Sequence, residues 1–275
     1  MGVDYAADSR TGVSGLPIYK EGKDDGFMKI VILCGGYGTR LAGAGSDLPK
    51  PMTPIGGRPI VWHIMRGLAH WGFKDFVLCL GYRSDIFKQY FLNLLTMVGD
   101  VTLDPTAGVS LHTTEQLDEK DWKVTLAETG LDSMTGHRVK RIAAHLPAED
   151  DLFAVTYGDG VTDLDFRKVV EFHRAHGKLA TVTGVRPPAR FGELTMDANG
   201  QVHEFNEKLQ ATGGWISGGY FVFSRGVFDY LSDDPTLVLE RDPLQQLARD
   251  GELMAYQYDG FWYCMDNPRD YQHLQ

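Results

Sequence analysis

The chain has 275 residues, of which 43% are hydrophobic and 23% are charged, and its formal net charge is −10. These proportions fit one sizeable globular domain, alone or with an insert. The acidic balance argues against nonspecific binding to nucleic acid or to an anionic membrane. No apolar run approaches the length of a membrane span and no secretory signal opens the chain. Three widely separated cysteines, without metal-ligand spacing, agree with a reducing compartment, so we expect a cytoplasmic protein.

Residues 1–27 are rich in Gly, Asp, Ser and Lys and show no hydrophobic period. We expect them to form a flexible N-terminal extension, because such a segment can bury little apolar surface. The apolar pattern starts at Met28, and neither an internal repeat nor a low-complexity linker interrupts the chain after that residue. The sequence therefore predicts one folded domain over residues 28–275.

Strand and helix patterns alternate in the first part of this domain. An apolar run predicts a buried strand at 28–34, and a second one predicts a strand at 76–80. Helical periodicity predicts helices at 59–71 and 84–95. This β-α-β-α order predicts a parallel sheet with helices on both faces. Ligands of such sheets bind beyond the carboxyl ends of the strands, so the segment after residue 34 is a candidate site.

The rest of the domain is less regular. Alternating segments at 109–113 and 124–126 are typical of antiparallel strands. Further expected elements are a helix at 136–146, a strand at 152–157, a helix at 164–176 capped by Asp163, a strand at 180–185, a hairpin of 193–196 with 202–205 turning at Asn199-Gly200, a strand at 215–223 and helices near 225–231 and 242–250. His173 and His176 lie three residues apart in one of these helices, and without an evident third ligand we expect an exposed helix face there rather than a metal site.

A glycine-rich segment follows the first predicted strand and reads Leu-Cys-Gly-Gly-Tyr-Gly-Thr-Arg-Leu over residues 33–41. Glycines let a phosphate approach the backbone, and successive N–H groups can form an anion-binding nest. Arg40 can fork onto phosphate oxygens, and Lys50, in Lys-Pro-Met, supplies a second charge. The dinucleotide fingerprint fits poorly because Leu41 takes the place of its third small residue, and no Gly-Lys-Ser/Thr of a P-loop is present.

Two aspartates are candidate metal ligands. Asp159 follows the predicted strand at 152–157 and lies between two glycines, and Asp266 ends the run Tyr-Cys-Met-Asp. Carboxylate oxygens suit Mg²⁺, which keeps several waters and takes few protein ligands. The local pattern of Asp159 also fits an Asx turn, and Asp266 taken alone is typical of a surface residue.

The whole string Gly-Gly-x-Gly-Thr-Arg-Leu, followed by Lys-Pro-Met, resembles the signature of the sugar-1-phosphate nucleotidylyltransferases. Residues 129–138, which read Thr-Gly-Leu-Asp-Ser-Met-Thr-Gly-His-Arg, look like the glucose-1-phosphate cytidylyltransferases within that family. So do the segments 62–65, 156–160 and 187–192, and the resemblance covers roughly residues 28–271.

The resemblance implies an α/β fold, a single Rossmann-like nucleotidyltransferase domain. Its central sheet would be mostly parallel with helices on both faces, and a small antiparallel region would bind the sugar. The implied reaction transfers a cytidylyl group from CTP to a sugar 1-phosphate, in the first place α-D-glucose 1-phosphate, with Mg²⁺ as cofactor. The family also implies a homo-oligomer.

The resemblance also implies roles for individual residues. The implied catalytic residues are Arg40, Lys50, Asp159 and Lys208. The implied nucleotide-binding residues are Leu33, Gly35, Gly36, Gly38, Thr39, Arg40, Lys50, Ser133, Thr135, Gly136, Arg138 and Gly158. The implied substrate-binding residues are Tyr157, Gly192, Glu207, Lys208, Ser217 and Gly219. Asp159 and Asp266 would share one Mg²⁺.

Four positions depart from the family pattern. Cys34 replaces a usual alanine beside the nucleotide, and His137 replaces a usual glycine in the loop near the base. Ser217 and Leu209 replace an asparagine and a proline near the sugar. Because sites that read hydroxyls by hydrogen bonds discriminate strongly, a different phosphorylated acceptor stays open. Use of another nucleoside triphosphate and a catalytically silent, nucleotide-binding regulatory subunit are the remaining alternatives.

Overall fold

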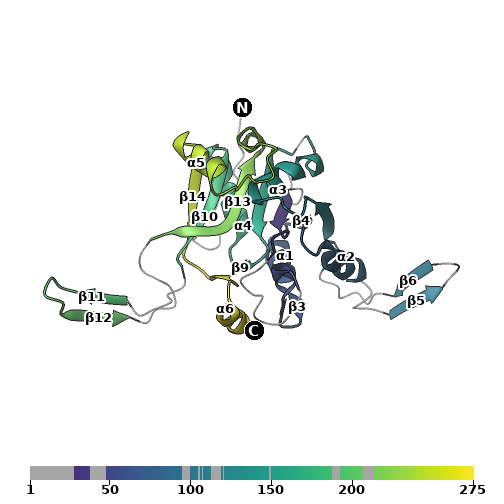
Figure 1. Ribbon diagram of the computed structural model, residues 1–275, viewed down its shortest axis with the longest axis horizontal. Coiled ribbons are helices and arrows are strands. Elements are labelled where there is room, and N and C mark those ends of the chain that lie inside the picture. Colours follow the sequence, from purple (N-terminus) through teal and green to yellow (C-terminus); the bar gives the residue numbers. More distant parts are fainter. Residues whose placement is uncertain are drawn as a thin grey trace, which may run out of the picture.

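The computed structural model describes residues 28–37, 48–94, 100–104, 106, 108–112, 119, 121–148, 150–187, 193–206 and 214–275. Its centre is one seven-stranded sheet in the order β14-β10-β13-β8-β1-β4-β7 (Figure 1). The strands of this sheet are β1 (Lys29–Leu33), β4 (Asp75–Leu80), β7 (Lys123–Glu128), β8 (Leu152–Tyr157), β10 (Ala180–Val185), β13 (Ile216–Ser224) and β14 (Leu253–Tyr258). The predicted domain boundary at residue 28 stays a prediction, since residues 1–27 lie outside the described part.

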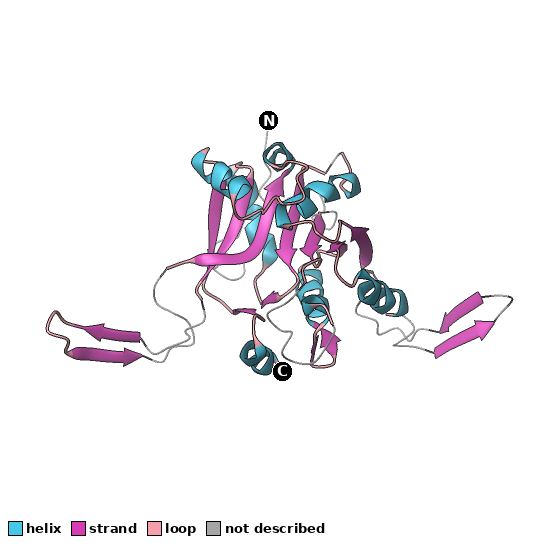
Figure 2. Ribbon diagram, in the orientation of Figure 1, coloured by secondary structure: helices cyan, strands magenta, loops and turns pink. Residues whose placement is uncertain are grey.

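Helices cover both faces of the sheet (Figure 2). The α-helices are α1 (Ile60–His70), α2 (Ser84–Asn93), α3 (Thr135–Arg141), α4 (Phe166–His176), α5 (Asp242–Arg249) and α6 (Pro268–Leu274). The 3-10 helices among the described residues are η3 (Lys50–Met52), η5 (Ile142–His145) and η6 (Arg225–Tyr230). None of the helices that the structure describes is long and apolar enough to span a bilayer.

The pairing of the strands confirms a mostly parallel sheet. Strand β1 pairs in parallel with β4 and β8, β4 with β7, and β10 with β14, whereas β13 runs antiparallel between β8 and β10. Successive side chains of a strand point to opposite faces. Ile30 and Ile32 therefore pack with α1 and α4, while Val31 packs with α3 and α5 on the other side. Because both faces are covered, β1 is apolar throughout most of its length.

Short antiparallel strand pairs accompany the main sheet in the described part of the chain. They are β2 (Pro54–Ile55) with β3 (Arg58–Pro59), β5 (Asp100–Asp104) with β6 (Gly108–His112), β9 (Gly160–Thr162) with β15 (Trp262–Cys264), and β11 (Glu193–Met196) with β12 (Val202–Asn206). The last pair confirms the predicted hairpin, whose turn places Gly200 at φ +85°. The pairs β5–β6 and β11–β12 extend away from the sheet (Figure 2).

Two predictions about these elements are wrong. The alternating segment 124–126 does not form an antiparallel strand, because β7 pairs in parallel with β4 at the edge of the sheet. An edge strand is only partly covered, so its sequence can alternate like that of an antiparallel strand. Helix α4 is capped by Asp165, which accepts from the backbone N of Arg167 at 3.2 Å, whereas the carboxylate of Asp163 accepts from the Tyr258 hydroxyl.

The prediction of an exposed histidine face on α4 is also wrong for His173. Its ring is buried, with Nδ1 2.9 Å from Thr181 Oγ1 and Nε2 2.9 Å from Ser224 Oγ. These hydroxyl groups belong to β10 and β13, which α4 covers. Spacing along the helix could not show partners that neighbouring strands provide.

Candidate active site

The site lies where β1 and β8 end side by side. Their parallel register pairs Leu33 with Tyr157, so the two segments that follow leave the sheet at the same edge. A pocket of about 340 Å³ opens there. It is lined by Leu33, Cys34, Gly35, Gly36, Lys50, Pro51, Ser133, Met134, Thr135, Arg138, Tyr157, Gly158, Asp159 and Asp266. Residues far apart in sequence therefore meet at the ligand edge that the β-α-β-α order predicts.

Lys50 joins two carboxylates at this pocket. Its Nζ lies 2.6 Å from Asp159 Oδ2 and 2.7 Å from Asp266 Oδ1. Burial tends to lower the pKa of the Lys50 ammonium, but the charge and hydrogen bonds of the two aspartates outweigh it, and the pKa lies above its ordinary value. The ammonium therefore stays charged at neutral pH, which suits a group that faces phosphates.

Backbone pairing explains how Asp266 reaches Asp159. Strand β15 pairs with β9, and the backbone N of Met265 donates to the carbonyl of Asp159 at 2.9 Å. The next residue is held by the N-terminus of α6, where Asp270 Oδ2 accepts from the backbone N of Asp266 at 2.9 Å. Neither β9 nor β15 is predicted from the sequence, so this link between the two aspartates could not be found there.

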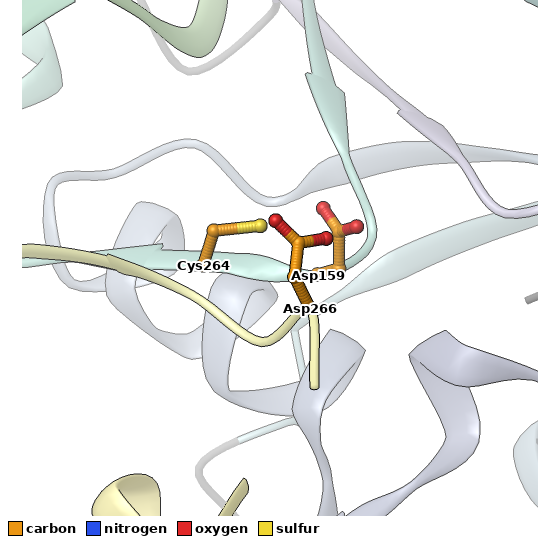
Figure 3. Close-up of side chains that lie close together, drawn as sticks. All are labelled: Asp159, Cys264 and Asp266. Atoms are coloured by element: carbon orange, nitrogen blue, oxygen red, sulfur yellow. The ribbon is translucent and has the colours of Figure 1, made fainter. Parts of the chain in front are cut away.

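The carboxylate pair has a sulfur neighbour (Figure 3). One ligand atom each of Asp159, Cys264 and Asp266 lies within 4.8 Å of the others. Burial, and then the charge of Asp159, raise the pKa of the Cys264 thiol well above its usual range, so the sulfur stays protonated and is a poor metal ligand. The hard carboxylate oxygens are the donors that a cation such as Mg²⁺ prefers, and their contacts with the Lys50 ammonium show that they attract positive charge.

Arg138 of α3 is buried behind the glycine-rich segment. Its Nη1 donates to the carbonyl of Leu80 at 2.9 Å and to Thr129 Oγ1 at 2.7 Å, and its Nη2 donates to the carbonyls of Gly35 at 3.0 Å and Leu131 at 3.3 Å. Burial lowers the pKa of this guanidinium, but arginine keeps its charge in proteins. One side chain thus ties the ends of two strands to the loop at 129–134.

Gly35 and Gly136 are required by close approaches. A Cβ added to Gly35 would lie 2.1 Å from Arg138 Nη1, so only glycine leaves room for the guanidinium. A Cβ at Gly136 would lie 2.8 Å from Leu237 Cγ. The backbone N of Gly136 also donates to the carbonyl of Leu237 at 2.9 Å, and Thr135 Oγ1 lies 2.8 Å from Glu240 Oε2. Gly136 therefore supports the pocket wall without lining the pocket.

The nucleotidyl transferase family model matches residues 29–273. This chain belongs to the nucleotidyl transferase family. It is 46% identical over 249 residues to the glucose-1-phosphate cytidylyltransferase of Salmonella typhi, covering 90% of this chain and 95% of that protein. It is 40% identical over 240 residues to a probable glucose-1-phosphate cytidylyltransferase of Bacillus subtilis, covering 87% and 91%. The crystal structure of HddC from Yersinia pseudotuberculosis matches with a TM-score of 0.62 and 25% identity, covering 90% and 97%.

In this nucleotidyl transferase, most of the sequence-predicted residues that the structure describes meet at the pocket. Ser217 and Gly219 do not line it. Ser217 Oγ accepts from the backbone N of Gly219 at 3.3 Å, and Gly219, with φ +77°, packs behind the ring of Tyr157. The predicted residues Gly38, Thr39, Arg40, Gly192, Glu207 and Lys208, and the departure at Leu209, lie outside the described residues.

Sequence reasoning missed two groups of residues around the pocket. Pro51 and Met134 line it, and Pro51 already belongs to the Lys-Pro-Met signature. The second group is the segment 235–240, whose backbone carbonyls hold the loop before α3: the N of Met134 donates to Pro235 at 2.8 Å. Backbone contacts between segments about a hundred residues apart produce no local sequence pattern, so they could not be predicted.

Proposed function

We propose that this nucleotidyl transferase transfers the cytidylyl group of CTP to glucose 1-phosphate and releases pyrophosphate. The observation that carries the proposal is the pocket between β1 and β8. Glycine backbone and a buried arginine form one wall, and Lys50 between two carboxylates stands at another. Two relatives, at 46% and 40% identity, have names that state or suggest this activity, which supports CTP and glucose 1-phosphate as the substrates.

The chemistry needs positioning and positive charge more than acid–base catalysis. The attacking phosphate oxygen of the sugar is already ionised, so a bond to the α-phosphorus of CTP can form without a general base. The bond between the α-phosphorus and the bridging oxygen to the β-phosphate breaks in line, and pyrophosphate leaves with the electron pair. Lys50 would stabilise charge at the α-phosphate. Arg40 at the β- and γ-phosphates and Lys208 at the sugar phosphate stay predictions.

Mg²⁺ is the cation that we propose for Asp159 and Asp266. Their oxygens fit its preference for hard ligands, as the contacts to Lys50 indicate. When bound, the ion would neutralise phosphate charge, and Lys50 would add its own. Equilibrium dialysis tests whether this carboxylate pair holds the metal. It uses Mn²⁺ as a substitute for Mg²⁺ and compares the wild-type protein with the Asp266→Asn variant.

The test of the proposed function is pyrophosphate release in the presence of Mg²⁺. CTP, UTP, dTTP, ATP and GTP are each supplied with glucose 1-phosphate, and the sugar nucleotide formed is identified by mass spectrometry. Release with CTP, and little with the other four, is the expected result. Absence of release with CTP, from protein that binds CTP, would remove glucose 1-phosphate as the acceptor.

A different acceptor is the second candidate, and Ser217 favours it. Its short hydroxyl bonds to the backbone of Gly219 rather than lining the pocket, and it replaces the amide that is usual in the family. A panel of sugar 1-phosphates and other phosphorylated metabolites, assayed with CTP, separates this candidate from the first. Turnover at least tenfold faster with another acceptor would establish it.

Assembly and location are proposals as well. A homo-oligomer is what the family resemblance implies, and the acidic chain with widely spaced cysteines agrees with a cytoplasmic enzyme. Light scattering on the purified full chain measures the oligomeric state directly.

A further inference from the structure

Asp270 lies in the first turn of α6, and its carboxylate accepts hydrogen bonds from the segment just before that helix. Its Oδ2 accepts from the backbone N of Asp266 at 2.9 Å and from the backbone N of Asn267 at 3.1 Å. Its Oδ1 accepts from the Tyr263 hydroxyl at 3.3 Å. Asp270 is only 8% exposed, so these hydrogen bonds are largely shielded from water. One buried carboxylate therefore holds three positions of the segment that leads into α6.

The bond to Asp266 is more than the cap of α6 needs. In a capping box, the N-cap side chain and the side chain three residues later each accept from the other's backbone N. Asn267 and Asp270 form such a box, in which Asn267 Oδ1 accepts from the backbone N of Asp270 at 3.1 Å. The bond from Asp266 is additional, and Asp266 lines the pocket. The carboxylate of Asp270 thus serves Asp266 as well as the helix.

The backbone of Asp266 is fixed from two directions. The preceding residue, Met265, is completely buried, and its backbone N donates to the carbonyl of Asp159 at 2.9 Å. The next backbone N, that of Asp266, is held by Asp270. From this backbone the Asp266 side chain places Oδ1 2.7 Å from Lys50 Nζ. The side chain is 36% exposed, so its position depends more on the fixed backbone than on packing around it.

Helix α6 also contacts the chain on the Lys50 side of this ion pair. Gln275, which follows α6, donates from Nε2 to the carbonyl of Pro54 at 2.9 Å. Side chains of α6 pack against a buried cluster that contains Ile55. Both contacts fall just after η3, which begins at Lys50. The helix that carries Asp270 therefore braces both segments that meet at the ion pair of Lys50 and Asp266.

We propose that Asp270 is a positioning residue that fixes Asp266 as a ligand of the cation at the pocket. A ligand whose backbone is already ordered loses less conformational freedom when the ion binds, so the affinity is higher. Groups that orient metal ligands by hydrogen bonds typically change metal affinity by about 10–100-fold when they are removed. This inference rests on the proposed binding of Mg²⁺ by Asp159 and Asp266.

Substitutions at Asp270 separate position from charge. Asp270→Ala removes the acceptor, whereas Asp270→Asn keeps an oxygen that can accept from Asp266 and loses only the charge. Asp270→Ser has a side chain one bond shorter and is the second variant, to be used if the alanine variant does not fold. Asp165→Ala is the matched control, because Asp165 caps α4 by accepting from the backbone N of Arg167 at 3.2 Å. Among the described residues, α4 contributes none to the pocket lining.

The measurement is equilibrium dialysis of Mn²⁺ against the full chain without nucleotide, with thermal melting to check folding. We expect the dissociation constant to rise about tenfold or more in Asp270→Ala and Asp270→Ser, and to stay within about threefold of wild type in Asp270→Asn. Asp165→Ala should stay within about twofold, although it also melts at a lower temperature than wild type. In an Asp266→Asn background, Asp270→Ala should add little, since it acts through Asp266.

The outcomes are separable. A wild-type dissociation constant in Asp270→Ala, or in Asp270→Ser where the alanine variant does not fold, overturns the inference. Equal losses of affinity in Asp270→Ala and Asp165→Ala would overturn it as well, because affinity would then simply follow stability. Equal losses in Asp270→Ala and Asp270→Asn would assign the effect to charge instead of position. A wild-type protein that does not bind Mn²⁺, or an Asp266→Asn variant that binds it as tightly, would contradict the proposed metal site itself.

Discussion

The structure contains two buried polar networks that differ in charge. One surrounds Arg138 beside the pocket, and the other surrounds His173 on the opposite face of the sheet. Arg138 and His173 are buried to similar extents, at 4% and 1% exposure. Arg138 keeps a full positive charge and gives its protons to neutral oxygens around the pocket. Burial, and then the neighbouring basic groups His176 and Arg174, lower the pKa of His173 to about 4, so it is neutral at pH 7.

The hydrogen bonds around His173 form a neutral series with one consistent direction. The backbone N of Lys178 donates to His176 Nδ1 at 2.9 Å, so a neutral His176 carries its proton on Nε2 and donates to Thr181 Oγ1 at 2.7 Å. The Thr181 hydroxyl then donates to His173, whose other nitrogen donates to Ser224. Each member gives one proton and needs no counterion. An uncharged buried network can only stabilise the fold, whereas a buried positive charge beside a pocket can also attract an anionic ligand.

The largest effects should come from the charges at the pocket. Lys50→Ala and Asp159→Ala should each lower turnover by about 10²–10³, equivalent to about 3–4 kcal/mol of transition-state stabilisation. Both variants should remain folded, because the lost ion pairs are partly exposed. Steady-state pyrophosphate release measures the effect. Lys140→Ala, which removes a contact to the carbonyl of Phe228 away from the pocket, is the matched control and should keep near-normal turnover.

Arg138 should affect both stability and binding. Arg138→Met leaves the carbonyls of Leu80 and Gly35 without their donor, and we expect a loss of about 2–4 kcal/mol of unfolding free energy. Weaker CTP binding should accompany it, because the glycine-rich segment and the loop at 129–134 lose their common anchor. Urea denaturation and calorimetric titration measure the two effects. Arg141→Met, at an exposed position of the same helix, is the control; equal stability of the two variants would contradict the role of Arg138.

The His173 network should make stability depend on pH and leave turnover alone. The pKa of His173 is about 4 in the folded protein and near 6.5 when unfolded, so between these values the unfolded chain binds more protons. Stability from this group is complete above pH 6.5 and declines as the pH falls toward 4, by at most about 3 kcal/mol. His173→Gln removes this titration, so its stability deficit relative to wild type should shrink from pH 7 to pH 4 in urea denaturation. A constant deficit, or a loss of CTP turnover at pH 7, would break the distinction between the two networks.

Much of the scaffold could be predicted because its signals are local. The apolar runs at 28–34 and 152–157 predict strands, and the structure confirms β1 and β8. The ends of parallel strands meet at one edge, which is why the segments that follow Leu33 and Tyr157 line the same pocket. The fold class and the family that the motifs indicate are confirmed as well.

The remaining features of the fold and the site depend on long-range contacts, which the sequence of a short segment does not reveal. The β9–β15 pairing brings Asp266 to Asp159, yet each strand has only three residues. His137 contacts Asp233, which lies 96 positions away in the sequence. The hydroxyl groups around His173 belong to neighbouring strands, and the periodicity of a helix gives no information about them. Pattern reasoning therefore predicted candidate residues of which most that the structure describes meet at one pocket, and it missed the contacts that hold them there.

Two threonines on β10 allow the smallest and most closely matched test. Thr181 and Thr183 point to the same face of the sheet, and both are almost completely buried. Thr181 Oγ1 bonds to His173 and His176, whereas Thr183 Oγ1 has no hydrogen-bond partner among the described residues. Valine has nearly the same shape without the hydroxyl.

Thr181→Val should therefore cost about 1 kcal/mol or somewhat more of unfolding free energy, because it leaves histidine nitrogens unpaired. Thr183→Val should instead be neutral or stabilising by up to about 1 kcal/mol, since it removes a buried hydroxyl that gains nothing in return. Denaturation in urea at pH 7 compares the two variants with wild type, and turnover with CTP should be unchanged in both. If the two substitutions cost the same, the hydrogen bonds of Thr181 contribute nothing beyond packing, and the neutral network would be a consequence of the fold rather than one of its supports.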